Sequence, residues 1–318
     1  MRILITGSSS FTGMHFIEAL AQKGHHITAL FSQPQTSYTG IAAIRMRRIQ
    51  HIADCQYNIP YGTDIFLDVV QKQNVDVYCH HWSYTKNYQH VDFDLEQAIQ
   101  KNTKQIVPVL KTLSKHGCTK IAVTGSIFSG FRSEQLSAQL PFSPYGLSKK
   151  IQSEIFHLYG DILGLDVRTF VIPNPFGAFD NRKMVSIFLE QWLKNNEAQV
   201  FIPKYIRDNI HVELLAQSYA WWIDSFVNNP QNTNSIYLPS GYQMSVASFV
   251  EKLAQEMRPR LQVPCLFHCL EQRDFTQPLE LINQIDVATH LQISTDQYWD
   301  NIAQFALTYL NSERSKIY

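Results

Sequence analysis

Net charge, long apolar runs and cysteine are all scarce or missing in this sequence. The 27 lysine and arginine residues equal the 27 aspartate and glutamate residues, so the formal net charge is zero. A chain that holds nucleic acid through its phosphate backbone needs a basic excess that displaces counterions. We therefore expect no nucleic-acid partner.

The chain contains no run of about 18 apolar residues, the length that signals a membrane-spanning helix. Its first residues, MRILITGSSS, pass from one arginine directly into a short strand-like run and lack the apolar core of a secretory signal. The sequence therefore predicts a cytoplasmic protein that does not insert into a membrane.

Cysteine is sparse, with five in 318 residues. They are scattered at Cys55, Cys79, Cys118, Cys265 and Cys269. An odd number at irregular spacing predicts free thiols in a reducing compartment and argues against a disulfide framework. Cys265 and Cys269 flank His268, but one such pair without a second pair of ligands is a weak metal signal, so we expect no bound metal.

The N-terminal half has a regular alternation of strand and helix patterns. Apolar strand patterns lie at residues 2–7, 25–32, 75–83, 120–126 and 166–174. Helical spacing fills the gaps between them, including one long helical stretch over 95–117. This alternation requires right-handed crossovers and a parallel sheet covered by helices on both faces. We predict an α/β fold with a doubly wound parallel sheet.

Beyond Gly177 the alternation is lost. Helical patterns dominate at residues 183–196, 212–229 and 245–257, with a short strand and turn at 235–241. We predict one domain over residues 1–177 and a smaller C-terminal α/β lobe over 178–318, with segments that return to the sheet. Because ligands of open α/β sheets bind outside the carboxyl ends of the strands, the lobe is expected to bind mainly substrate.

The turn after the first strand, TGSSSFTG at residues 6–13, opens the first helix. Gly7 permits a sharp turn, and Gly13 permits close packing of helix on strand. The helix N-terminus offers free N–H groups and a positive dipole end to a pyrophosphate. Ser10 stands where a middle glycine is expected, and its β-carbon narrows the space. The context favours dinucleotide binding, and the plain alternative is a strand–helix turn rich in small residues.

The second predicted strand ends in Phe31, Ser32 and Gln33, where an acidic residue that holds the adenosine ribose is expected. Without that carboxylate nothing repels a 2′-phosphate, and Ser32 offers it a hydroxyl. The arginines within residues 45–48 either reach the phosphate or form a solvated basic turn. We favour NADP slightly over NAD.

The stretch SPYGLSKK, residues 143–150, places a tyrosine and a lysine four residues apart. Pro144 suits the start of a helix, so Tyr145 belongs to the first turn and Lys149 to the same face. Apolar residues on another face are Ile151, Ile155 and Leu158. We expect this apolar face to meet the core and the tyrosine–lysine pair to point away from it.

Such a pair is suited to proton handling. A phenol has a pKa near 10, and lowering it by about three units requires roughly 4 kcal/mol of preferential stabilisation of the phenolate. A lysine ammonium and an oxidised nicotinamide ring, both positive, supply that stabilisation. The predicted strand over 120–126 ends near Thr124 and Ser126, either of which can hold a substrate oxygen while its proton moves.

The glycine-rich turn, the strand-end hydroxyl and the Tyr-x3-Lys pair together resemble the short-chain dehydrogenase/reductases. More closely, the chain resembles their extended branch, the NAD(P)-dependent epimerase/dehydratase family that acts on nucleotide sugars. Further matching segments follow in order over nearly the whole chain: VDVYCHHWS (75–83), Asn102, VIPNPFG (171–177) and RDNIHVELLA (207–216). The resemblance makes residues 1–177 an NAD(P)-binding Rossmann domain and implies a homodimer.

The resemblance also implies roles for individual residues. Tyr145 is expected to be the general acid/base, Lys149 its activator and ribose clamp, and Thr124 the hydroxyl that orients substrate. Ser126 is the alternative hydroxyl, and the plain alternative for either is a strand-end cap. The cofactor-binding residues are expected to be Gly7, Ser9, Ser10, Phe11, Thr12, Gly13, Ser32, Trp82, Lys149 and Pro173. The substrate-binding residues are expected to be Asn174, Arg207 and Arg273.

One departure from the family narrows the reaction. A 4,6-dehydratase of this family carries Asp-Glu directly after the threonine, whereas Gly125 and Ser126 stand there in this chain. Dehydration is therefore disfavoured, and epimerisation or one-way reduction of a 4-keto-sugar nucleotide remains. A catalytically idle dinucleotide-binding sensor or partner protein of the same fold is the alternative. The sugar and the nucleotide depend on the loop over 131–142 and on the C-terminal lobe.

Overall fold

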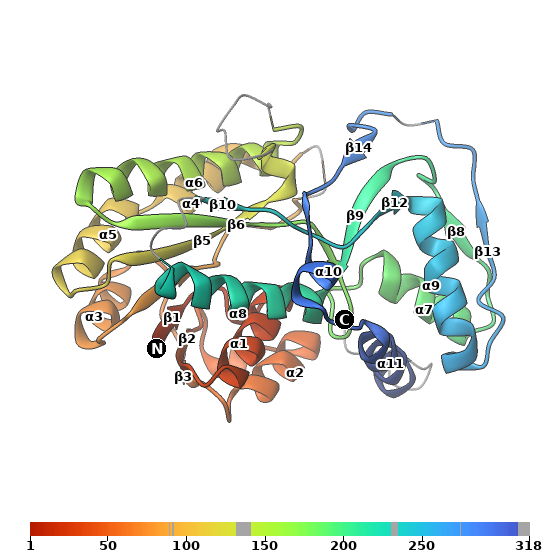
Figure 1. Cartoon of the computed structure of the whole chain (residues 1–318), viewed down its shortest axis with the longest axis horizontal. Helices are drawn as coiled ribbons and strands as arrows, with labels where there is room; N and C mark the ends of the chain where they lie inside the picture. Colours follow the sequence, from red (N-terminus) through yellow and green to blue (C-terminus); the bar gives the residue numbers. More distant parts are fainter. Residues whose placement is uncertain (89, 91, 132–140, 230–234, 274, 311–318) are drawn as a thin grey trace. The chain divides into compact units, whose positions relative to one another are not determined.

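A computed structural model describes residues 1–88, 90, 92–131, 141–229, 235–273 and 275–310. It divides into two compact units (Figure 1). Unit 1 comprises Met1–Tyr38, Arg45–Ile172 and Ala216–Leu238, and unit 2 comprises Thr39–Ile44, Pro173–Leu215 and Pro239–Tyr318. Most of the segment expected to select the sugar, residues 132–140, lies outside the described residues.

Unit 1 is built on a seven-stranded sheet whose paired strands are all parallel. The strands in spatial order are β10 (Ile236–Tyr237), β6 (Asp166–Ile172), β5 (Lys120–Ser126), β4 (Val77–His80), β1 (Arg2–Ile5), β2 (His26–Leu30) and β3 (Asp54–Gln56). The central strands are short apolar runs buried on both faces, as parallel strands between helix layers must be. The predicted doubly wound α/β fold is confirmed.

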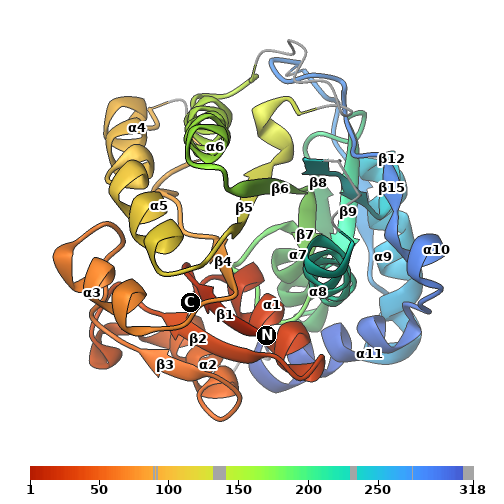
Figure 2. The same ribbon diagram turned by 60° about the vertical axis from the view of Figure 1, so that its left-hand side comes forward.

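Helices cover both faces of this sheet (Figures 1 and 2). Those that belong wholly or largely to unit 1 are α1 (Phe11–Gln22), α3 (Asp64–Lys72), α4 (Leu95–Thr103), α5 (Ile106–Lys115), α6 (Pro144–Leu163) and α8 (Val212–Asn228). Helix α2 (Gly40–Ile49) is divided between the two units, with Arg45–Ile49 in unit 1. Helices α4, α5 and α6 lie on one face, and α1 and α8 lie on the other. Leu110 of α5 and Phe156 of α6 share one buried core with Tyr78 and Ile121 of the sheet.

The stretch predicted as one helix over 95–117 forms two helices. Helix α4 ends at Thr103, and Gln105 adopts a left-handed conformation with φ of 60° before α5 begins. Pro108 follows in the first turn of α5. A proline is tolerated there because its missing N–H has no intrahelical partner in the first turn, whereas in a continuous helix it would remove a hydrogen bond. The prediction of one helix was therefore wrong.

Helix α6 begins and ends where its sequence indicates. Ser143 is the N-cap and accepts a 3.0 Å hydrogen bond from the Gly146 N–H, Pro144 is the first helical residue, and Gly164 ends the helix in a left-handed conformation. The prediction of its core-facing side was only partly right: Ile155 packs against the buried core, but Leu158 does not face it. Leu158 is 57% exposed, whereas Lys149 is only 3% exposed.

The buried side of α6 is polar and small, because it presses close to the sheet. Its buried residues are Gly146, Ser148, Lys149, Gln152, Ser153, Phe156 and Gly160. A β-carbon at Gly146 would lie 2.0 Å from the Phe128 carbonyl oxygen, and one at Gly160 would lie 2.3 Å from a methyl of Val167. The apolar positions counted in the sequence therefore do not mark the side that faces the sheet.

Unit 2 is a smaller lobe of short strands and helices. Its four-stranded sheet contains β7 (Asn174–Phe176), β9 (Ile206–His211), β12 (Tyr242–Ser245) and β14 (Glu280–Leu281). Two two-stranded sheets pair β8 (Ala198–Val200) with β13 (Phe267–Cys269) and β11 (Pro239–Ser240) with β15 (Ile285–Asp286). The helices are α7 (Met184–Leu193), α9 (Val246–Leu261), α10 (Val287–Leu291) and α11 (Asp296–Phe305), the last of which continues into a π-helical turn at Ala306–Leu310.

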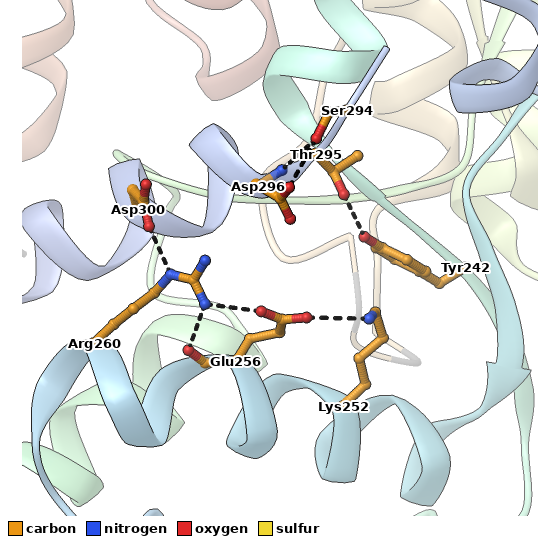
Figure 3. Close-up of polar contacts among 8 residues, drawn as sticks. All are labelled: Tyr242, Lys252, Glu256, Arg260, Ser294, Thr295, Asp296 and Asp300. Atoms are coloured by element: carbon orange, nitrogen blue, oxygen red, sulfur yellow. Dashed lines mark hydrogen bonds and ion pairs between the residues drawn. The ribbon is translucent and has the colours of Figure 1, made fainter. Parts of the chain in front are cut away.

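Polar contacts tie α9 to α11 (Figure 3). Arg260 bonds to the Glu256 carboxylate at 2.8 Å and to Asp300 at 2.7 Å, and Lys252 lies 3.3 Å from Glu256. Beside this network the Tyr242 hydroxyl lies 3.2 Å from that of Thr295. Of these ion pairs, Arg260–Asp300 is the one that joins the two helices, and a partly exposed pair of this kind contributes little free energy of unfolding.

Among the described residues, no helix combines the length and the apolar character needed to cross a bilayer. All five cysteines carry free thiols, as predicted. Within the same part of the chain, no three His, Cys, Asp or Glu side chains stand together as a metal site.

Candidate functional site

The turn between β1 and α1 is packed too tightly for side chains at its two glycines. Gly7 has a φ of +73°, and a β-carbon there would lie 2.9 Å from the carbonyl carbon and oxygen of His81. A β-carbon at Gly13 would lie 2.4 Å from the Gly7 carbonyl oxygen. Both glycines therefore let the turn, the helix and the segment after β4 approach each other closely.

Ser10, at the middle position of the turn, is the N-cap of α1. Its hydroxyl oxygen accepts a 3.0 Å hydrogen bond from the Gly13 N–H. The serine therefore satisfies one of the four free N–H groups at this helix end, which a glycine there would leave open. Ser9 and Thr12 are partly exposed beside it, and the positive end of the helix dipole faces the same place.

A buried arginine lies against this turn. Arg45 of α2 is 2% exposed, and its guanidinium donates to the Ser9 carbonyl oxygen at 3.3 Å. The same guanidinium lies 5.9 Å from the centre of the Phe11 ring. Arg48 instead pairs with Glu18 at 2.8 Å. Among the arginines within residues 45–48, Arg45 therefore contacts the turn directly, whereas Arg48 pairs with a side chain of α1.

The segment after β4 is fixed to the same turn. The Thr6 hydroxyl oxygen accepts hydrogen bonds from the backbone N–H groups of His81 and Trp82, each at 3.0 Å. The Trp82 indole stacks on Tyr61 with ring centres 5.7 Å apart. This places Trp82, a predicted cofactor contact, directly beside Gly7.

The two candidate hydroxyls at the end of β5 have different environments. Thr124 is buried, donates to the His80 carbonyl oxygen at 3.3 Å and lies 2.9 Å from Nδ1 of His81. Ser126 accepts a 3.2 Å hydrogen bond from the Phe128 N–H and caps the short 3-10 turn Ile127–Ser129. Ser126 thus has the strand-end capping contact that was the plain alternative.

Tyr145 lies in an aromatic environment in the first turn of α6. Its ring centre is 5.0 Å from that of Tyr88, 6.0 Å from that of Phe93 and 6.3 Å from that of Phe128. Burial, followed by the nearby Tyr88, raises the pKa of the Tyr145 phenol above its usual value. The phenol therefore holds its proton firmly unless positive charge is brought near it.

Lys149 is a buried amine whose hydrogen-bond partner is neutral. Its Nζ donates to Oε1 of Gln152 at 2.7 Å, and burial lowers its pKa to about 7. Gln152 is itself fully buried, and its amide nitrogen lies 3.0 Å from the Asn102 carbonyl oxygen and 3.0 Å from Nε2 of His80. Sequence reasoning missed Gln152, although its spacing of three from Lys149 on a helix was a usable signal.

The surroundings of Gln152 fix the proton of His80. The amide nitrogen of Gln152 only donates, so Nε2 of His80 accepts and the ring proton lies on Nδ1, 2.8 Å from the Tyr78 hydroxyl. Asn102 joins this network: its side chain accepts from the Tyr84 N–H at 2.7 Å and donates to the Ser148 hydroxyl at 3.3 Å. The asparagine thus ties the segment after β4 to α6.

The expected substrate residues lie in unit 2. Asn174 begins β7, and its buried amide nitrogen has no hydrogen-bond partner among the described residues. Arg207 on β9 is buried and donates to Gln277 and to the carbonyl oxygens of residues 206, 278 and 279 at 2.8–3.2 Å. Burial lowers its pKa to about 10. Arg273 has a side chain 85% exposed and pairs with Glu271 at 3.0 Å.

The remaining predicted residues take less distinctive positions. Ser32 lies two residues after Leu30, the last residue of β2, and is partly exposed. Pro173 is buried and is the first residue of unit 2 after β6. Unit 1 therefore brings together the turn, Trp82, Thr124 and the first turns of α6 at the carboxyl ends of β1, β4 and β5. That edge is where ligands of open α/β sheets bind.

The sequence was compared with known families and proteins. The model of the NAD dependent epimerase/dehydratase family matches residues 3–237. The chain therefore belongs to this family. A curated protein of Methanocaldococcus jannaschii, named "Putative UDP-glucose 4-epimerase", is 22% identical over 255 residues, which cover 71% of this chain and 75% of that protein.

Solved structures of nucleotide-sugar enzymes share the fold. UDP-glucuronic acid 4-epimerase from Bacillus cereus, in complex with UDP-glucuronic acid and NAD, has a TM-score of 0.74 at 15% identity, covering 97% of this chain and 99% of that one. The dTDP-glucose 4,6-dehydratase from Streptomyces venezuelae has a TM-score of 0.73 at 14% identity, covering 97% of each chain. Epimerases and a dehydratase thus share this architecture.

Proposed function

We propose that the protein is an NAD-dependent nucleotide-sugar epimerase in which Tyr145 is the general acid/base. The observation that carries the proposal is that a phenol packed among aromatic rings and a buried amine occupy successive turns of α6, at the strand ends that also hold the dinucleotide turn. A one-way 4-ketoreductase would use the same groups and is the second candidate.

The turn at residues 6–13 fits a dinucleotide. Glycines at both ends let the turn pack closely against its neighbours, and no acidic side chain is present in the turn to repel a pyrophosphate. When bound there, the nicotinamide supplies acceptance and return of a hydride. The NADP preference expected from Ser32 gains no support from the structurally similar epimerases, whose complexes contain NAD. Titration with NADH and NADPH, followed by nicotinamide fluorescence, compares the two cofactors directly.

Positive charge is what this site must supply to the phenol. Without it, the pKa of Tyr145 is raised, so the phenol is a poor base. Protonated Lys149, with its pKa lowered to about 7, carries a charge in a growing fraction of molecules as the pH falls towards neutrality. The Tyr145 oxygen then takes the proton of the reacting sugar hydroxyl, and Thr124 holds that hydroxyl in place.

Residues of unit 2 are suited to a sugar diphosphate. Arg207 contacts only neutral oxygens among the described residues, so its charge is available to an anion. The amide nitrogen of Asn174 is a second donor that needs a partner. A buried unpaired donor costs free energy until a ligand supplies the acceptor. Arg273 is exposed and is a weaker candidate for the same role.

The packing around Gly125 argues against dehydration. A β-carbon there would lie 2.9 Å from a methyl of Thr169 on β6. An acidic side chain at this position, where a dehydratase of this family carries one directly after the threonine, would therefore require the Thr169 side chain to move. This supports epimerisation over elimination of water.

The decisive test replaces Tyr145 by Phe. Because general acid/base catalysis contributes about 100-fold to 10,000-fold, we expect Tyr145→Phe to lower the rate at least 100-fold. Tyr159→Phe, on the same helix but outside the site, is the matched control and is expected to retain the wild-type rate. A wild-type rate in Tyr145→Phe would show that the assigned role is wrong.

The substrate for this assay comes from a binding screen. UDP-, GDP-, dTDP- and CDP-sugars are compared by thermal shift in the presence of NAD, because a ligand that binds only the folded state raises its stability. If NAD binds and no sugar nucleotide is turned over, the idle dinucleotide-binding sensor is favoured instead. The capped N-terminus of α1, with Ser10 in place of glycine, is the observation behind that alternative.

A homodimer is the expected assembly. Leu147, Leu158 and Ile162 are 36%, 57% and 65% exposed and lie along one side of α6. Apolar side chains gathered on one helix face indicate a protein contact. We take this stripe to be the dimer contact.

A further inference from the structure

One imidazole joins the dinucleotide turn to the catalytic hydroxyl. Nε2 of His81 lies 3.0 Å from the Ser10 hydroxyl and 2.9 Å from the Thr12 hydroxyl, both in the turn. Nδ1 of the same ring lies 2.9 Å from the Thr124 hydroxyl. These contacts span 71, 69 and 43 residues of sequence. The ring is therefore the direct connection between two parts of the proposed active site.

The hydrogen-bond partners indicate which ring nitrogen carries the proton. Thr124 donates its hydroxyl proton to the carbonyl oxygen of His80, which can only accept. The Thr124 oxygen must then accept from His81, so Nδ1–H is the donor. Nε2 is left as the acceptor for the hydroxyls of Ser10 and Thr12. One lone pair of the Thr124 oxygen stays available for a substrate hydroxyl.

The ring has little freedom to leave this position. The His81 backbone N–H is held by Thr6, and its carbonyl lies against Gly7. On one side the ring packs against Phe16 of α1, with centres 5.1 Å apart. Burial, followed by the charge of Lys149, lowers the pKa of His81 to about 3, so the ring stays neutral near neutral pH. A neutral imidazole has one donor and one acceptor, so Nδ1–H donates to Thr124 and the single lone pair of Nε2 is shared by the hydroxyls of Ser10 and Thr12.

We propose that His81 is a positioning residue that holds the Thr124 hydroxyl in register with the dinucleotide turn. This rests on the proposed function. It also gives Ser10 a reason to replace glycine: the serine hydroxyl caps α1 and anchors the imidazole at the same time. Loss of the ring should therefore affect both cofactor binding and turnover, through two different atoms.

Two substitutions of His81 distinguish the contribution of Nδ1 from that of Nε2. The amide of an asparagine lies near the Nδ1 position of histidine, and that of a glutamine lies near Nε2. We expect His81→Asn to lose mainly NAD affinity and His81→Gln to lose mainly turnover, each by roughly fivefold to tenfold, the value of one hydrogen bond. His81→Phe should lose both. His116→Gln, at an exposed histidine after α5, is the control. Equal behaviour of the Asn and Gln variants, or wild-type values in the Phe variant, would overturn the proposal.

A measurement without turnover keeps this test separate from the proposed function. Ring nitrogen chemical shifts of labelled protein report the tautomer of each histidine, and the signals missing in His81→Phe identify those of His81. We expect the Nδ1–H tautomer at pH 7. A charged ring or the Nε2–H tautomer would contradict the proposal. If the wild type turned over no sugar nucleotide, the proposed function would fail. The NAD affinities of the variants and the tautomer of His81 would still test whether His81 is a positioning residue.

Discussion

At the scale of the residue, Lys149 is the group whose surroundings matter most. A buried ammonium is costly unless a carboxylate pairs with it, and the hydrogen-bond partner of Lys149, Gln152, is neutral. The folded protein therefore binds a proton at Lys149 much less readily than the unfolded chain does. The pKa falls from 10.5 to about 7, so the charge that the site needs makes folding less favourable.

This cost predicts a pH-dependent effect of Lys149→Met on stability. Below about pH 7 the amine is charged in both states, and the folded wild type bears the full burial cost. Between pH 7 and 10.5 the unfolded state binds more protons, so wild-type stability rises with pH. We expect the variant to be more stable than the wild type at pH 6, by about 2 to 4 kcal/mol after the lost hydrogen bond is counted.

Urea unfolding of the cofactor-free proteins at pH 6 to 9 measures this difference. It should shrink as the pH rises. Lys150→Met, on the same helix at a partly exposed position, is the control and should show no such trend. A difference between Lys149→Met and the wild type that is constant with pH would mean that the amine keeps its ordinary pKa in the folded protein.

At the scale of the element, α6 depends on glycines for its contact with the sheet. The β-carbon of an alanine at position 146 would meet a backbone oxygen, whereas at position 160 it would meet a methyl group of Val167. A side chain can change rotamer, but the backbone of the 3-10 turn at Ile127–Ser129 moves only with its strand. The first contact is therefore the less tolerant of the two.

We expect Gly146→Ala to lower the free energy of unfolding by about 2 to 4 kcal/mol and Gly160→Ala by only about 1 kcal/mol. Gly146→Ala should also lower turnover, because it displaces the neighbouring Tyr145 from the end of β5. Urea titration and steady-state assays of both variants measure the two effects. Equal losses of stability in the two variants would mean that α6 moves away from the sheet as a rigid unit.

Local chemistry made the start of α6 predictable. Ser143 and Pro144 at its start, like the glycine that follows β1, act through neighbours one to three residues away. The side of α6 that is buried was not predictable in the same way. Its sheet-facing positions carry Lys149 and Gln152, so the apolar pattern marked that side only in part. Such conflicts between local pattern and burial are expected at functional sites.

At the scale of the whole molecule, long-range contacts set the limit of prediction. The alternation of strands and helices indicated the parallel sheet, and the order of motifs indicated the family. His81 contacts Thr12, which is 69 positions away in the sequence, and Ser10, which is 71 positions away. No spacing pattern in the sequence predicts contacts between residues so far apart. The edge strand β3 was also missed, because three residues carry too little pattern.

The exposed stripe on α6 predicts the oligomeric state. If Leu147, Leu158 and Ile162 form the dimer contact, Ile162→Lys should convert a dimer to a monomer, because a buried unpaired ammonium is costly. Light scattering coupled to size-exclusion chromatography measures the mass. Ile52→Lys, at another exposed isoleucine, is the control. A monomeric wild type would rule the contact out.

The hydrogen bonds of Arg207 have a consequence for how a ligand binds. The guanidinium is already held in one rotamer by carbonyl and amide oxygens, and its central carbon lies 4.2 Å from the centre of the Tyr205 ring. The Arg207 side chain therefore loses its conformational entropy when the protein folds, and not when an anion binds. A diphosphate that binds Arg207 as proposed would meet a rigid, poorly hydrated cation, so association should require no rearrangement of this arginine.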